Sequence, residues 1–186
     1  MSPSTATPQF GIDLSSEPQR IGIFIFQSIP HESNFLYGEL SNQGLLNQKD
    51  TDILFANSAT DLARQVERYA AKYTRIVVFS SGIFHLSTDL STYRTPFGLA
   101  RSIKRAAPHA MFFTLSGTFE GPEMKVIDGV IRKNMPHNRK FYCNENGDYK
   151  YPGNLLHYWR LFELLPLYIE ANGDPEVILN YLRQHP

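Results

Sequence analysis

Short apolar runs that alternate with helix-like segments are the feature that most constrains how this sequence folds. The run at 21–27 is a nearly unbroken series of isoleucine and phenylalanine, which is typical of a strand buried on both faces of a parallel sheet. Strands that alternate with helices form right-handed βαβ units, so we expect an α/β fold with a five-stranded parallel sheet covered on both faces. The other expected strands are 52–56, 75–79, 111–115 and 126–131.

Helix-start signals lie between these runs. Ser58 or Thr60 is placed to cap one helix, and Thr95 caps another whose first residue is Pro96, a position that needs no amide donor. An earlier helix is expected to begin near Pro30 and to close at Gly44. The predicted helices therefore connect successive strands.

The last quarter of the sequence changes pattern. The segments 140–143 and 148–151 flank an Asn-Gly step, which predicts a hairpin. Asn154 is then expected to cap an apolar helix over 155–169, which Pro166 should kink or restart, and a last helix begins at 174–176. The apolar helix either packs on the sheet beneath the last helix or presents part of its surface to a partner or to a second copy of the chain.

Length and composition restrict the domain organisation and the class of function. The 186 residues fit one α/β domain over 21–186 with a C-terminal helical extension from about 138, after a flexible arm over 1–20 that is rich in serine, threonine and proline. The 18 basic residues balance the 18 acidic ones, which argues against a dedicated nucleic-acid binder. The sequence has one cysteine, Cys143, and no long apolar run, so we expect a cytoplasmic protein with no disulfide and no membrane span.

Three segments resemble landmarks of response-regulator receiver domains. The stretch 97–103 is similar to the start of the helix after the phosphorylation loop, 111–117 to a fourth strand that ends in a hydroxyl residue, here Ser116, and 127–133 to a fifth strand with a terminal lysine, here Lys133. The resemblance covers residues 20–134. It implies a flavodoxin-like, three-layer fold and a role in signalling.

The phosphorylation chemistry of receivers is missing from this sequence. The stretch that matches the receivers' acidic pair for magnesium is Phe26-Gln27-Ser28, and Phe79-Ser80-Ser81 stands where they carry the phosphate-accepting aspartate. Magnesium prefers carboxylate ligands, and an acyl phosphate needs a carboxylate. The chain is thus interpreted as a degenerate receiver, or pseudo-receiver, in which Ser80, Ser116 and Lys133 form a remnant or anion site.

A receiver-like fold without its acids is expected to work through its surfaces. We therefore predict a regulatory module that binds another protein, with a homodimer as one possible form, and with no cofactor, metal or catalytic residue. The loop from Ser80 to Arg94 is longer than receivers use, and unusually long loops commonly carry function. The predicted contact residues are the aromatic and apolar side chains of this loop and of the C-terminal helix: Phe84, Leu86, Tyr93 and Trp159.

The alternative is an enzyme that binds a small molecule, a flavin or a nucleotide. Ligands of parallel sheets bind beyond the carboxyl ends of the strands. The polar residues expected there include His31, Glu32, His85 and Ser116. These residues form none of the common nucleotide, metal or hydrolase motifs, so the sequence favours the binding module.

Overall fold

A parallel sheet lies at the centre of the computed structural model, which describes residues 20–82, 84, 93–116, 122–134 and 139–186. All of its strand pairs are parallel, and the strand order is β2-β1-β3-β4-β5, so the expected sheet is confirmed. Its strands are β1 (Ile21–Phe26), β2 (Thr51–Ala56), β3 (Arg75–Ser81), β4 (Met111–Ser116) and β5 (Gly129–Arg132).

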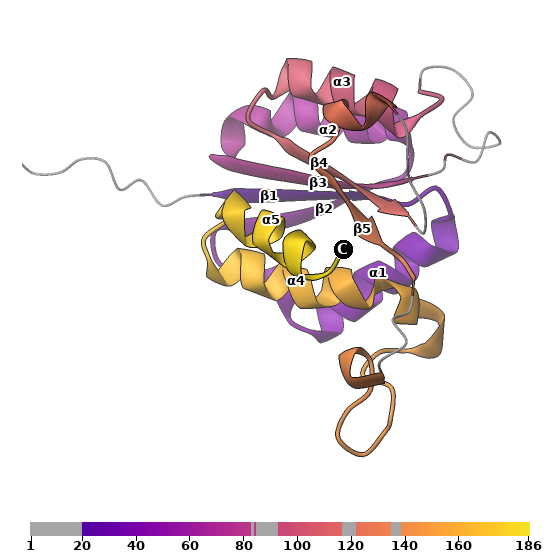
Figure 1. Ribbon diagram of the computed structural model, residues 1–186. Coiled ribbons are helices and arrows are strands. Elements are labelled where there is room, and N and C mark those ends of the chain that lie inside the picture. Colours follow the sequence, from indigo (N-terminus) through magenta and orange to yellow (C-terminus); the bar gives the residue numbers. More distant parts are fainter. Residues whose placement is uncertain (1–19, 83, 85–92, 117–121, 135–138) are drawn as a thin grey trace, which may run out of the picture.

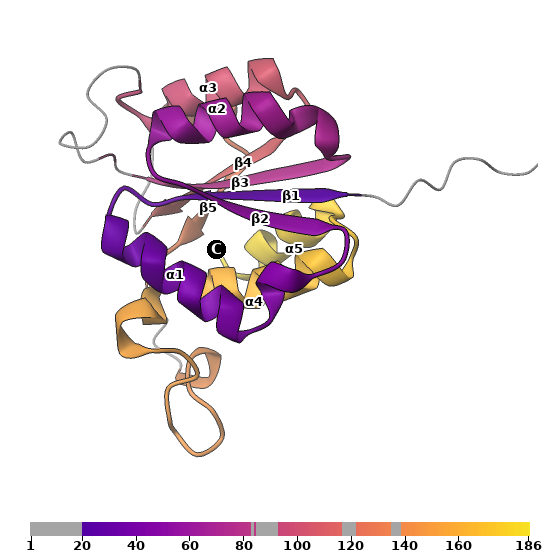
Figure 2. The same ribbon diagram turned by 180° about the vertical axis from the view of Figure 1, so that it is seen from behind.

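Helices cover both faces of the sheet and complete a three-layer arrangement. Figures 1 and 2 show α2 and α3 on one face and α1, α4 and α5 on the other. Two of the predicted caps form, because Ser58 accepts a hydrogen bond from the backbone of Asp61 and Thr95 accepts one from the backbone of Gly98. The helices are α1 (Pro30–Asn42), α2 (Ala59–Tyr69), α3 (Pro96–Ala106), α4 (Trp159–Glu170) and α5 (Pro175–Gln184).

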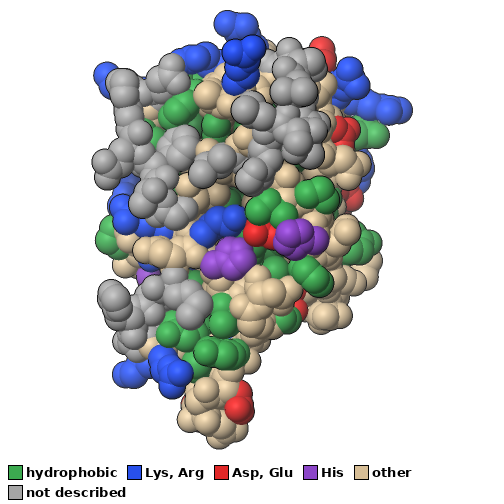
Figure 3. Space-filling view, turned by 90° about the vertical axis from the view of Figure 1, so that its right-hand side faces the viewer, with side chains coloured by type: hydrophobic (Ala, Val, Ile, Leu, Met, Phe, Trp, Pro, Cys, Tyr) green, Lys and Arg blue, Asp and Glu red, His purple; other side chains and the backbone are tan. Residues whose placement is uncertain are grey.

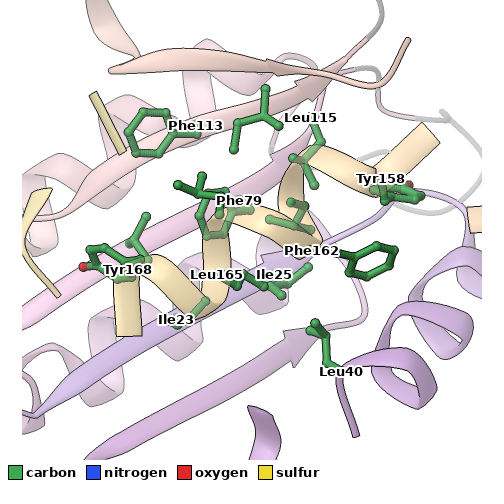
Figure 4. Close-up of a cluster of buried hydrophobic side chains, with 14 of the residues drawn as sticks. Ile23, Ile25, Leu40, Phe79, Phe113, Leu115, Tyr158, Phe162, Leu165 and Tyr168 are labelled. Carbon is green, nitrogen blue, oxygen red and sulfur yellow. The ribbon is translucent and has the colours of Figure 1, made fainter. Parts of the chain in front are cut away.

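The sheet separates two hydrophobic clusters. Alternate residues of β1 point to opposite faces, so Ile23 and Ile25 pack with α1 and α4, whereas Phe24 packs with α2 and α3. Figure 4 shows the first cluster, in which side chains of the sheet meet those of α4, among them Phe162 and Leu165. Every residue of β1 is buried, which confirms that this strand is covered on both faces.

The fifth strand differs from its predicted range. It covers Gly129–Arg132 rather than 126–131, because Pro122–Val126 form a 3-10 helix (η3). Asp128 lies just before the first ladder pair, and its backbone nitrogen donates to the carbonyl oxygen of Phe112 at 2.8 Å. The Asp128 carboxylate accepts a hydrogen bond from the backbone nitrogen of Phe112 at 2.7 Å, so a side chain replaces a strand partner there. Between β4 and β5, the described residues include the 3-10 helix η3.

The C-terminal segment also differs from its prediction. The hairpin is reduced to one antiparallel bridge between Cys143 and Tyr149, because the side chain of Asn144 accepts bonds from the backbone of its own turn. Asn154 caps no helix, since it lies inside the 3-10 helix η5 (Gly153–Tyr158), and α4 begins only at Trp159. Pro166 lies inside α4 without ending it.

Gly22 in β1 has no room for a side chain. A Cβ atom built on it would lie 2.5 Å from the ring of Tyr73, which is buried and is held by a hydrogen bond from its hydroxyl to Asp52 at 2.9 Å. We expect Gly22→Ala to lower the free energy of unfolding by about 1–3 kcal/mol through overpacking. Urea denaturation measures this change.

Gly38 provides the matched control, because nothing lies within 4 Å of a Cβ atom built there. Gly38→Ala in α1 should raise stability by roughly 0.5–1 kcal/mol through helix propensity. The same sign for both substitutions would contradict the steric explanation.

Among the described residues, no helix combines the length and the apolar character that crossing a bilayer requires.

Candidate functional site

The carboxyl ends of the strands bring several of the predicted site residues together. The side chains of Ser28 and Ser81, which follow β1 and end β3, hydrogen-bond at 3.0 Å between their Oγ atoms in a buried position. The backbone nitrogen of Lys133 donates to the carbonyl oxygen of Ser116 at 3.0 Å. Ser116 and Lys133 therefore lie at the same edge of the sheet, as expected from the sequence.

The side chain of Lys133 points to a carboxylate rather than to a strand end. Its Nζ atom lies 3.3 Å from Oε2 of Glu32, in the first turn of α1, and both side chains are largely buried. The same Nζ atom lies 4.6 Å from the ring centroid of Tyr158, a cation–π contact. The positive charge of Lys133 is thus satisfied inside the protein.

Tyr158, in the C-terminal segment, contacts both residues of this ion pair. Its buried hydroxyl donates to the Glu32 carboxylate and lies 2.9 Å from the amide oxygen of Gln27. A phenol has one proton, which goes to the charged acceptor because charge-assisted hydrogen bonds are stronger. Nε2 of Gln27 is buried without a hydrogen-bond partner among the described residues, so the amide nitrogen of this side chain is an unsatisfied donor there.

The electrostatics favour an anionic Glu32. Burial alone would raise the pKa of its carboxyl group, but the hydrogen bond from Tyr158 and the charge of Lys133 outweigh burial, and the pKa lies below its usual value. Nε2 of His157 lies 3.8 Å from Oε1 of Glu32. Burial and the charge of Lys133 nevertheless lower the pKa of His157, so this imidazole is neutral at pH 7.

Two residues anchor the C-terminal segment beside this site. Nη1 of Arg160 donates to the side chain of Asn134 at 2.7 Å and to the carbonyl oxygen of Arg132 at 3.2 Å. The indole nitrogen of Trp159 donates to the carbonyl oxygen of Asn134 at 3.3 Å. The start of α4 is therefore fastened to the chain that leaves β5, which holds Tyr158 over Lys133.

Figure 3 faces the carboxyl ends of the strands, where histidine, acidic and basic side chains gather among hydrophobic ones. We name the residues that close this edge the locked cluster. Its members are Gln27, Glu32, Lys133, His157 and Tyr158.

The charges of the locked cluster are paired. One carboxylate is matched by one ammonium group, and no group of three or more potential metal ligands occurs in the part of the chain that the structure describes. The strand end that would carry a phosphate acceptor holds Ser80, buried, with its hydroxyl donating to the carbonyl oxygen of Ser81 at 3.3 Å.

The residues predicted for the enzymatic alternative do not all assemble. Glu32 joins the locked cluster, whereas His31 is exposed and contacts the ring of Phe35 on the same helix. The backbone carbonyl oxygen of Ser116 accepts a hydrogen bond from the backbone nitrogen of Lys133, and His85 lies outside the described residues.

The predicted partner-binding residues are mostly packed against the protein itself. Phe84 contacts the ring of Phe26 edge-on, and the hydroxyl of Tyr93 hydrogen-bonds Ser102 at 2.8 Å. Trp159 is 1% exposed, so it is a core residue in this structure, which agrees with the interpretation that the apolar helix is buried. Leu86 lies outside the described residues.

His157 and Tyr158 were not predicted as site residues. They lie in an apolar run that indicates a core helix, and the histidine within that run is the one local signal of another role. They reach Glu32 only because η5 returns to the carboxyl edge of the sheet, 126 positions after Glu32 in the case of Tyr158.

The strand order defines the class of fold. Parallel strands in the order 2-1-3-4-5, with helices on both faces, form the flavodoxin-like arrangement that response-regulator receivers share. The fold is therefore receiver-like.

Comparisons with solved structures find chains of the same class. One is the receiver domain of an HD domain-containing protein from Pseudomonas fluorescens Pf-5, 18% identical, with 66% of this chain and 82% of that chain covered and a TM-score of 0.42. Another is the isolated receiver domain of RcsB from Salmonella enterica serovar Typhimurium, 16% identical, with 62% and 78% covered and a TM-score of 0.40. No protein-family model matches the sequence, and no curated protein matches it.

Proposed function

We propose that this protein is a regulatory module that binds another protein through a receiver-like domain unable to accept a phosphoryl group. The internal ion pair between Glu32 and Lys133 carries the proposal. By resemblance, Lys133 stands where receivers carry the lysine that ends their fifth strand. Here Lys133 is neutralised by a carboxylate of the same chain and covered by Tyr158.

The strand ends support this proposal. Ser80 and Ser81 replace the acceptor aspartate, and Gln27 and Ser28 replace the acidic pair that would hold magnesium. A serine hydroxyl needs a base to become a nucleophile, and the hydroxyls of Ser80 and Ser81 have hydrogen-bond partners at the carbonyl oxygen of Ser81 and at Ser28 instead. What remains for function is the surface of the domain.

The proposed module covers residues 21–186, because the C-terminal helices share a hydrophobic cluster with the sheet. We propose a cytoplasmic location, since the one cysteine forms no disulfide within this chain.

The test is exposure of the full chain to radiolabelled acetyl phosphate with magnesium, with a phosphorylatable receiver as the positive control. We expect no acid-labile phosphate on this chain while the control is labelled. Acid-labile label on any carboxylate of this chain, Glu32 of the locked cluster included, would overturn the proposal. The second arm is affinity purification with mass spectrometry, in which a single co-purifying protein at near-equal amounts is expected.

A further inference from the structure

The helical face formed by α2 and α3 carries a marked excess of arginine. These two helices lie side by side on one face of the sheet (Figure 1). With the short 3-10 helix η2 (Ala70–Lys72), they hold six basic and two acidic residues, although the whole chain has no net charge. The basic residues of this face are Arg64, Arg68, Lys72, Arg101, Lys104 and Arg105.

The lysines of this face are neutralised within the protein, whereas Arg64, Arg68 and Arg105 form no ion pair among the described residues. Lys72 pairs with Asp52 at 2.6 Å and Lys104 with Asp128 at 2.8 Å. Among the described residues, no acidic side chain lies within ion-pair distance of Arg64 or Arg105, and both side chains are exposed.

Arg64 and Arg105 border the same surface hollow, between α2 and α3. Its volume is about 530 Å³, and Ala63, Glu67, Tyr93 and Ser102 also line it. The hydrogen bond between Tyr93 and Ser102 holds the tyrosine ring against α3. Within the described residues, the hollow therefore combines two guanidinium groups that lack an acidic partner with an apolar wall formed by the ring of Tyr93 and the side chain of Ala63.

A second hollow adjoins the first on the outer side of α2. It has a volume of about 380 Å³ and is lined by Leu54, Asp61, Arg64, Gln65, Arg68 and Tyr69. The carboxylate of Asp61 accepts hydrogen bonds from the backbone of Asn57 and the side chain of Gln65 rather than from an arginine. Arg64 belongs to both hollows, so a bound segment that crosses α2 would meet arginines on either side of it.

We propose that this arginine groove binds an acidic peptide segment of a partner protein. Guanidinium groups bind carboxylates through paired hydrogen bonds, and Arg64 and Arg105 have no carboxylate of their own within the described residues. The apolar wall suits hydrophobic side chains between the acidic ones. This inference rests on the proposed function and names the chemistry of its partner.

The groove suits a peptide better than a nucleic acid. Glu67 lies in its lining and would repel closely spaced phosphates, whereas a peptide can place a neutral side chain there. Nucleic-acid binding also draws on a general basic surplus, and the 18 basic residues of this chain are matched by 18 acidic ones.

The experiment measures fluorescence polarisation of labelled probes with the full chain. The probes are a twelve-residue peptide that alternates Glu or Asp with Leu, a matched peptide with Gln and Asn in place of the acids, and a twelve-nucleotide thymidine strand. We expect the acidic peptide to bind at least roughly tenfold more tightly than either other probe, as charge complementarity predicts. Thymidine binding of equal strength, or no binding of the acidic peptide, overturns the inference.

Two charge-reversal variants locate the site. R64E/R105E should weaken binding of the acidic peptide by roughly tenfold or more. K140E/K150E makes the same change of charge at exposed lysines of the protruding 139–151 segment, which Figure 1 shows at the opposite end of the molecule from α2 and α3, and should change binding less than about twofold. Equal weakening by both variants would show a general charge effect and overturn the inference.

The milder R64Q/R105Q should give an intermediate loss, which guards against misfolding of the charge-reversed protein. Thermal unfolding checks that all variants remain folded. A natural partner that binds R64E/R105E as well as the wild type would exclude the arginine groove and leave the proposed function intact. Phosphorylation by acetyl phosphate would overturn the proposed function whatever these arginines do.

Discussion

Replacement of Trp159 by alanine is expected to lower the free energy of unfolding by about 3–5 kcal/mol, the usual cost of removing a buried aromatic side chain. The indole is 1% exposed and packs with Tyr142, Cys143 and Leu156. It also donates a hydrogen bond to the carbonyl oxygen of Asn134. The substitution therefore leaves both a cavity and an unpaired carbonyl group.

Circular dichroism during urea denaturation is the appropriate measurement, because Trp159 is the one tryptophan of the sequence and its fluorescence is lost in the variant. Leu167→Ala is the matched control on α4, since Leu167 is 47% exposed. Its effect should stay within roughly 0.5 kcal/mol. Equal effects of the two substitutions would mean that Trp159 is not held in the core and is available to a partner.

Replacement of Lys133 by methionine should lower stability at pH 7 by about 1–3 kcal/mol, because the Glu32 carboxylate keeps its burial and loses its counter-charge. Methionine retains much of the length of the lysine stem, so contact with the Tyr158 ring is largely preserved. The loss then reports the charge interaction. Unfolding in urea at fixed pH measures it.

This loss should depend on pH in a defined direction. The pKa of folded Glu32 lies below its ordinary value of 4.5, so its stabilising contribution is complete above that value and disappears as the pH falls through the lowered pKa. The difference between the wild type and Lys133→Met should therefore shrink in acid. Lys133 also lowers the pKa of His157, because its positive charge repels a protonated imidazole. Below the ordinary pKa of histidine, Lys133→Met removes this repulsion and is stabilised by its removal, so the stability difference from the wild type shrinks in acid for this reason as well.

Glu32→Gln provides the control for this prediction. In that background Lys133→Met should cost less at pH 7, because no carboxylate remains to be left unpaired. The pH dependence that comes from Glu32 should be absent, which leaves only the part that comes from the repulsion between Lys133 and His157. A Lys133→Met effect that is the same in both backgrounds would show that the ion pair contributes nothing.

The strands and most helices were predictable from local patterns. Buried parallel strands are continuous apolar runs, and caps such as Ser58 and Thr95 precede their helices within a few residues. The errors lie where a side chain competes with the backbone ladder or turn. Asp128 shortens β5 in this way, and Asn144 reduces the hairpin to a single bridge.

The site was predictable only in part. Ser116 and Lys133 share an edge because all carboxyl ends of a parallel sheet lie together, and this follows from the predicted fold alone. The partner of Lys133 does not follow from it, since Glu32 lies 101 positions away on another element. The contacts of Tyr158 with Glu32 and Lys133 depend on how η5 and α4 pack against the sheet.

The sequence by itself determined a parallel α/β fold and the lack of acids at the strand ends, because apolar periodicity and residue identity are local properties. Only the tertiary structure decided that Glu32 neutralises Lys133 beneath Tyr158, and that two arginines of α2 and α3 share one hollow. Such pairings join side chains far apart in the chain, and their energy depends on distance and burial, which arise only when the helices pack on the sheet.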